Sequence, residues 1–147
     1  MIERFSSFSP AVAELVAGAR FRPVDTLFDD EIRIDLGGVH VRLIGVGPNH
    51  TRGDTVMFVE EDRVLFTGDV VMSVFPSASA QAGSIAKWLT NMTAFEALAP
   101  AVVVPAHGRL GDVQSIRRYR DYLTAVRDET RAAKRQGRSV EEAGRAL

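Results

Sequence analysis

Two histidines and one aspartate are the residues of this sequence best suited to hold a catalytic metal ion. His50, Asp69 and His107 each stand just after a segment that has the pattern of a buried β-strand. Loops at strand ends often carry ligand-binding groups, because the sheet holds them in place. Two imidazoles and a carboxylate are enough to bind one zinc ion with an open position. Taken alone, the same residues also fit hydrogen-bonded loop histidines and an aspartate that closes a turn.

The composition limits which chemistry these residues can perform. The chain has 147 residues, 46% of them hydrophobic and 25% charged, which is typical of one globular domain with its own core. It contains no cysteine, so disulfides, thiolate zinc sites, iron–sulfur clusters and cysteine nucleophiles are excluded. Any metal ion must therefore be held by carboxylates and by the three histidines.

The charge pattern argues against a nucleic acid or a membrane as partner. The formal net charge is −1, although residues 113–147 hold 9 basic and 5 acidic side chains. Acidic residues interleave with the basic ones, so we expect a solvated helix face there. No run approaches the ~18 apolar residues of a membrane helix, and the first residues lack the apolar run of a signal peptide. We therefore expect a cytoplasmic protein.

The hydrophobic pattern predicts strands in the middle of the chain and helices around them. Alternation predicts two strands joined by a Gly37-Gly38 turn, and apolar runs predict three more. The predicted strands cover 31–36, 39–46, 55–59, 63–67 and 101–104. Of these, 55–59 is nearly all apolar, which predicts cover on both faces. The sum is a layered α/β or α+β domain.

Helical spacing and capping residues predict four helices. A short one begins at Pro10 after Ser9 and runs to about Ala19, and an amphipathic one spans 85–98 with Trp88, Met92 and Phe95 in the core. The other two begin after Asp112 and at the capping box of Ser139 and Glu142. Residues 70–83 are expected to form a surface loop.

Three sequence elements, each at a predicted strand end, resemble motifs of the metallo-β-lactamase fold superfamily. They are Gly47-Pro48-Asn49-His50-Thr51-Arg52-Gly53-Asp54-Thr55, Leu65-Phe66-Thr67-Gly68-Asp69 and Val104-Pro105-Ala106-His107-Gly108. They match the family's G-P-x-H-T-x-G-D-T, F-T-G-D and P-x-H-G elements in the same order. The resemblance runs from about Asp30 to about Gln136, and it implies an αββα sandwich with a metal site at one edge.

The resemblance also implies roles for the residues near that edge. His50 corresponds to the third histidine of a first metal, Asp69 to a carboxylate that bridges two metals, and His107 to the last histidine of a second. Zinc is the implied ion, one or two per site, and iron or manganese also suit such ligands. Because position 69 is neither Cys nor Ser, a hydrolase similar to glyoxalase II or to lactonases is favoured over a β-lactamase.

Other loop residues have supporting assignments. Thr51 and Asp54 are predicted to brace the His50 loop, whereas Asn49, Arg52 and Phe75 are candidates to line a substrate surface or to be solvated loop residues. The remaining histidine, His40, lies on the polar side of its predicted strand, and a cross-strand contact with Asp35 accounts for it.

One departure from the family is as informative as the match. The family's H-x-H-x-D-H motif is absent, so four metal ligands and the water-activating aspartate have no counterpart, and no catalytic residue is assignable. Residues 1–147 therefore resemble a single incomplete domain, the C-terminal half of the sandwich, with a mixed sheet and flanking helices. One sheet face would lack its cover, so we expect a homodimer or a partner chain.

Three functions follow from this interpretation. The first is a hydrolase of esters, thioesters, lactones, amides or phosphoesters whose remaining ligands come from elsewhere. The second is a degenerate domain that serves as a binding or structural module. The third is a mononuclear metal binder that uses His50, Asp69 and His107 together. A small-molecule substrate is expected for the first.

Overall fold

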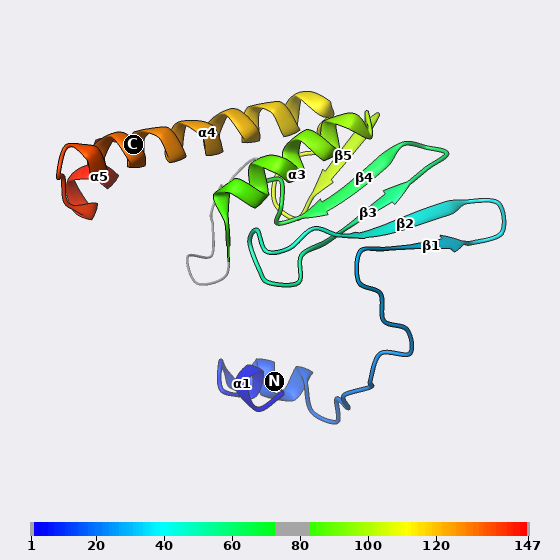
Figure 1. The fold of residues 1–147 in the computed structure, drawn as a ribbon. Coiled ribbons are helices and arrows are strands. Elements are labelled where there is room, and N and C mark those ends of the chain that lie inside the picture. Colours follow the sequence, from blue (N-terminus) through cyan, green and yellow to red (C-terminus); the bar gives the residue numbers. More distant parts are fainter. Residues whose placement is uncertain (1, 73–82, 147) are drawn as a thin grey trace.

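The fold is a single mixed sheet with helices packed over one of its faces (Figure 1). The computed structural model describes residues 2–72 and 83–146. The strands are β1 (Glu31–Asp35), β2 (His40–Gly45), β3 (Thr55–Val59), β4 (Val64–Gly68) and β5 (Val102–Pro105). The helices are α1 (Ile2–Ser6), α2 (Pro10–Leu15), α3 (Ile85–Ala97), α4 (Val113–Arg135) and α5 (Val140–Ala146).

The strand order is β1-β2-β3-β4-β5. β1 to β4 form an antiparallel meander, and α3 returns the chain so that β5 pairs with β4 in parallel. The mixed sheet with flanking helices confirms the predicted fold class. Gly37 and Gly38 make the tight turn between β1 and β2, with φ angles of 84° and 100° that favour glycine.

The hydrophobic core lies between the sheet and the two long helices. Sheet residues Val56, Phe58, Leu65 and Val103 are buried on this side. The helical side chains that cover them are Trp88, Met92 and Phe95 of α3 and Ile116, Tyr119 and Leu123 of α4. The predicted core role of Trp88, Met92 and Phe95 is confirmed, since none is more than 2% exposed.

The opposite face of the sheet is apolar and lacks helices among the described residues. Register places two rows of five apolar side chains on it. The first row is Ile32, Leu43, Met57, Phe66 and Val104, and the second is Ile34, Val41, Val59, Val64 and Val102. Phe66 and Ile34 are each 36% exposed, Val41 is 6% exposed, and the other seven are half-buried. We call these ten residues the open face. The expected cover on both faces of residues 55–59 is thus present on the helix side only.

The N-terminal helices lie apart from this core. In the described ranges, α1 and α2 contact each other and no strand, and α2 buries none of its residues (Figure 1). Ser9 caps α2 as expected, but the helix ends at Leu15 instead of continuing toward Ala19. Leu15 is 83% exposed, so its apolar side has no core to pack against. None of the helices in these ranges combines the length and apolarity that a membrane crossing needs.

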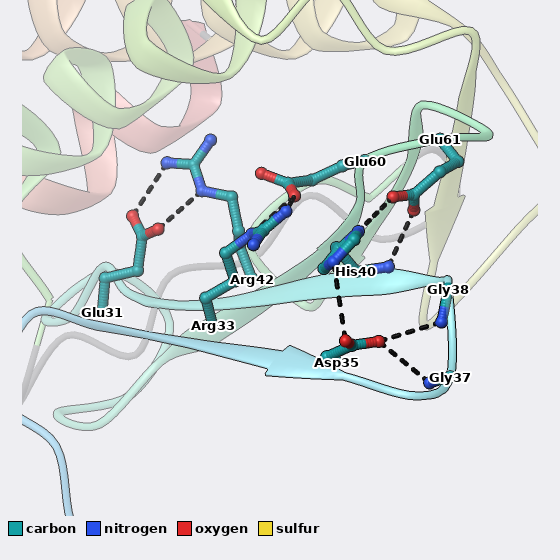
Figure 2. A network of polar contacts seen from close by, with 9 residues as sticks. All are labelled: Glu31, Arg33, Asp35, Gly37, Gly38, His40, Arg42, Glu60 and Glu61. Carbon is teal, nitrogen blue, oxygen red and sulfur yellow. Dashed lines mark hydrogen bonds and ion pairs between the residues drawn. The ribbon is translucent and has the colours of Figure 1, made fainter.

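A polar network covers the outer part of the sheet, on the helix-side face of β1 and β2 (Figure 2). Arg42 pairs with Glu31, and Arg33 pairs with Glu60 at 2.7 Å. The main partner of His40 is Glu61, whose Oε1 is 2.5 Å from His40 Nδ1. The predicted partner Asp35 lies 3.9 Å from Nε2 of His40. Sequence alone missed Glu61 because it reaches His40 from the β3–β4 turn.

The contacts of Glu61 with His40 are expected to affect how the free energy of unfolding changes at low pH. The backbone N–H of His40 and then its side chain lower the pKa of Glu61 to about 2. Because the folded-state pKa is lowered, Glu61 stabilises the fold above its ordinary pKa and loses that effect as the pH falls through about 2.

We expect Glu61→Gln to reduce the loss of stability between about pH 5 and pH 2, measured by urea unfolding. The exposed Glu129→Gln variant should leave the loss unchanged, and an equal change in both variants would contradict this role.

Candidate metal centre

The three predicted ligands meet at one end of the sheet. Asp69 follows β4 and His107 follows β5, and these strands run parallel, so both residues leave the sheet at the same edge. The N–H of Ala106 donates to the carbonyl of Gly68 at 3.0 Å and holds the two strand ends together. The His50 loop reaches this edge from β2. The structure therefore brings together His50, Asp69 and His107.

The Asp69 carboxylate lies between the two imidazoles. Its Oδ1 is 3.4 Å from His107 Nε2, and its Oδ2 is 3.9 Å from His50 Nε2. The Oδ1 atom is buried and accepts no hydrogen bond, which is uncommon for a carboxylate oxygen. The side chains of His50 and His107 are 28% and 59% exposed, so an ion can reach them. Two imidazole nitrogens and a carboxylate with an unused oxygen fit zinc.

A second group of metal-ligand types exists elsewhere. In the ranges 2–72 and 83–146, the one set of three whose ligand atoms all lie within 4.8 Å of one another is His40, Glu60 and Glu61. Arg33 already pairs with Glu60, and His40 with Glu61 (Figure 2). These contacts account for that group without an ion.

The His50 loop is held by the Asp54 carboxylate. The backbone N–H groups of Asn49 and Thr51 donate to it at 3.0 and 2.9 Å, and the Thr51 hydroxyl also donates to it. The peptide bond between Gly47 and Pro48 in this loop is cis. A Cβ at Gly47 would lie 2.3 Å from the carbonyl oxygen of Arg52, so only glycine fits there. Asp54 and Thr51 thus lie where they can brace the loop.

Asn49 is buried, and this corrects its assignment to a substrate surface. It is 0% exposed, and its Nδ2 donates to the carbonyl oxygen of Val46 at 2.8 Å. Asn91 of α3 donates from Nδ2 to Asn49 Oδ1 at 2.8 Å and to the same Val46 oxygen at 2.6 Å. The two amides satisfy each other in the core, so Asn49 ties the His50 loop to α3.

Sequence reasoning missed Asn91, although a signal was present. Asn91 lies beside Met92 on the buried side of α3, where an amide needs a partner.

We expect Asn91→Ala to lower the free energy of unfolding by about 1–3 kcal/mol, because Asn49 Oδ1 is left buried without a donor. Urea unfolding measures this. Thr90 is exposed on the same helix, so Thr90→Ala should lower the free energy of unfolding by clearly less. Equal losses in the two variants would contradict the anchoring role of Asn91.

The turn that follows Asp69 is also buried. Val70, Val71 and Met72 are 2–5% exposed, which corrects the expectation that residues 70–83 all form a surface loop. The indole N–H of Trp88 donates to the carbonyl of Val70 at 2.7 Å. The Thr67 hydroxyl lies 3.3 Å from the carbonyl oxygen of Val71. These contacts fix the turn that carries Asp69.

The other two predicted lining residues are Arg52 and Phe75. Arg52 is exposed and lines a shallow depression with Asp54 and Lys87. Phe75 lies outside the described residues.

Comparison with known proteins agrees with this architecture. A family profile for the metallo-beta-lactamase superfamily matches residues 4–107. A solved metallo-beta-lactamase from Pontibacter korlensis has a TM-score of 0.62 and 22% identity, over 79% of this chain and 56% of that one. The DIM-1 metallo-beta-lactamase gives a TM-score of 0.60 and 21% identity, over 78% and 55% of the two chains.

The chain spans about half the length of these solved structures. No curated protein sequence matches it. The profile match extends over more than half of the chain and ends at His107, so it includes His50, Asp69 and His107. On this evidence, the chain belongs to the metallo-beta-lactamase superfamily.

Proposed function

We propose that this chain provides the second part of a metal-dependent hydrolase site in which His50, Asp69 and His107 bind zinc. One observation carries the proposal. The Asp69 carboxylate lies between two imidazoles at a sheet edge, and its buried Oδ1 accepts no hydrogen bond. Membership of the superfamily supports the same role.

The distances favour a shared carboxylate over a single ion bound by all three residues. A tetrahedral zinc with ligands at about 2.1 Å holds its ligand atoms about 3.4 Å apart. His50, Asp69 and His107 do not form a set within 4.8 Å, whereas each imidazole has its own carboxylate oxygen nearby. This supports an arrangement in which His107 and His50 would hold separate ions and Asp69 would contribute one carboxylate oxygen beside each imidazole.

When bound, zinc supplies Lewis-acid activation of water and of the bond to be cleaved. The residues of this chain position the ligands. Asp54 fixes the loop of His50, and Trp88 fixes the turn after Asp69. We propose an ester, thioester, lactone, amide or phosphoester substrate. A carboxylate at position 69 supports a glyoxalase II-like or lactonase-like activity over β-lactam hydrolysis.

The remaining ligands of the family site are proposed to come from residues other than these 147. Three histidines cannot supply an H-x-H-x-D-H motif in addition to His50 and His107. A binding or structural module is the alternative, because the residues present hold only part of the family's ligand set.

Hydrolysis assays test this proposal. Zinc-loaded protein is assayed with a thioester, a lactone and a chromogenic β-lactam, before and after EDTA, both alone and together with a polypeptide that carries the H-x-H-x-D-H motif. We expect cleavage of the thioester or the lactone only in the combined sample, and both EDTA and His107→Ala should abolish it. Cleavage that survives both changes contradicts the proposal, and zinc binding without cleavage in the combined sample selects the binding-module alternative.

We also propose that a second copy of this chain covers the open face. All ten residues of this face are apolar, so two identical faces can pack together without burying a charge. Two sheets packed in this way lie about 10 Å apart. A continuous apolar surface that no other element covers is also uncommon on a monomer.

Phe66→Lys should convert this dimer to a monomer, because the substitution places a charge within the open face, between Met57 and Val104. Light scattering after size exclusion measures the mass. The matched control is Leu15→Lys, which alters an apolar side chain that is 83% exposed on α2, a helix without contacts to the described strands. A wild-type protein that is a monomer at micromolar concentration contradicts this arrangement.

A further inference from the structure

A cavity beside the candidate metal centre has no part in the proposed hydrolysis. It has a volume of about 230 Å³ and lies between α4, β5 and the buried turn after Asp69. Val71, Met72 and Val103 form its apolar floor. Arg109 and Arg118 line it as well, and both are exposed, so they form a basic rim.

One wall of the cavity carries a buried polar atom without a partner. Tyr119 is 4% exposed, and its hydroxyl forms no hydrogen bond. Burial, and after it the neighbouring Tyr122 and Asp69, raises the pKa of the Tyr119 phenol, so this group keeps its proton. A protonated phenol can donate a hydrogen bond, and a buried donor without an acceptor is costly. This feature points to a ligand that supplies an acceptor.

The charges around the cavity define the kind of acceptor. No aspartate or glutamate lines it. Among the described residues, neither Arg109 nor Arg118 forms an ion pair, although Arg118 donates to the Ser115 hydroxyl at 3.2 Å. Guanidinium groups bind carboxylates and phosphates through paired hydrogen bonds. An apolar floor with a basic rim therefore fits an oxyanion attached to an apolar group.

Backbone contacts at Gly111 determine the shape of one side of the cavity. Val103 and Gly111 exchange backbone hydrogen bonds of 2.8 and 2.9 Å, which closes the loop that carries both His107 and Arg109. A Cβ at Gly111 would lie 2.0 Å from Ser115 Oγ. Glycine at this position lets Ser115 approach the cavity wall.

We propose that this cavity binds a small organic anion, a carboxylate or a phosphate on an apolar body, through the Tyr119 hydroxyl and the guanidinium groups of Arg109 and Arg118. The site is separate from the zinc ligands. It uses the same loop as His107, so an occupied cavity would order the loop beside the metal centre.

Fluorescence of the sole tryptophan provides the test. The ring of Trp88 is 5.7 Å from that of Tyr119, so it reports on the cavity. The full chain is titrated in excess EDTA, which keeps any metal at Asp69 from binding the probes. The probes are phenylacetate, phenyl phosphate and the neutral phenylacetamide. We expect a saturable change with at least one anion and at least tenfold weaker binding of the amide. The tighter anion identifies carboxylate or phosphate as the preferred group.

Variants separate the proposed contacts from general charge effects. Tyr119→Phe keeps the ring, removes the donor and should weaken anion binding about tenfold, without loss of stability because that hydroxyl has no partner. Arg109→Gln, at an exposed position, should weaken it similarly, whereas Arg131→Gln on the outer part of α4 should not. Equal affinity for the amide, no effect of either cavity variant, or no saturation up to about 10 mM overturns the proposal.

Discussion

Replacing Trp88 by alanine is expected to lower the free energy of unfolding by about 3–5 kcal/mol. Trp88 is 0% exposed, fills the core between the sheet and α3, and packs against Tyr119. Its loss leaves a cavity and also leaves the Val70 carbonyl without its indole donor. The total free energy of unfolding of a native protein is about 5–15 kcal/mol, so this single substitution removes a large share of it.

Urea unfolding followed by circular dichroism measures the loss. Trp88→Phe separates packing from hydrogen bonding, because it keeps an aromatic ring and removes the N–H. The control Leu110→Ala, on an exposed loop, should change stability by less than about 0.5 kcal/mol. A loss below about 1 kcal/mol for Trp88→Ala would show that the core does not depend on this indole.

Replacing Asp69 by asparagine is expected to weaken zinc binding on the order of a hundredfold or more. The substitution keeps the size of the side chain and removes the charge that faces both imidazoles. Loss of a residue that only supports a ligand already costs about 10–100-fold in metal affinity, and loss of a ligand should cost at least as much. Competition with a chromogenic zinc chelator measures the dissociation constant.

The matched control is Asp62→Asn, at an exposed position in the turn between β3 and β4. It removes the same charge from the chain without touching the site, so its zinc affinity should equal that of the wild type. Similar weakening in both variants would mean that the net charge matters and that Asp69 does not bind the ion.

Much of the fold was predictable because local chemistry determines it. Alternating apolar residues gave the hairpin around Gly37, and Asp112 caps α4 by accepting from the N–H of Gln114 at 2.8 Å. The predicted capping box is present, since Ser139 and Glu142 exchange hydrogen bonds between side chain and backbone. These signals lie within a few residues of each other, so no tertiary contact was needed to interpret them.

The features that sequence reasoning missed depend on contacts between distant segments. Asn49 resembled a solvated loop residue because its partner Asn91 is 42 positions away. Val70 follows a glycine and an aspartate, which is typical of a surface turn, but the indole of Trp88 holds it in the core. The grouping of His50, Asp69 and His107 was expected from the order of the motifs at predicted strand ends, and the parallel pairing of β4 and β5 explains why Asp69 and His107 share a sheet edge.

The most direct test asks which histidine holds the ion. Zinc content and affinity are measured after dialysis for the wild type, His107→Ala and His40→Ala. If zinc binds at the Asp69 edge, His107→Ala holds clearly less zinc than the wild type and His40→Ala retains the wild-type amount. Retention by His107→Ala with loss in His40→Ala would instead place the ion on the Glu60 and Glu61 side of the sheet and would contradict the account.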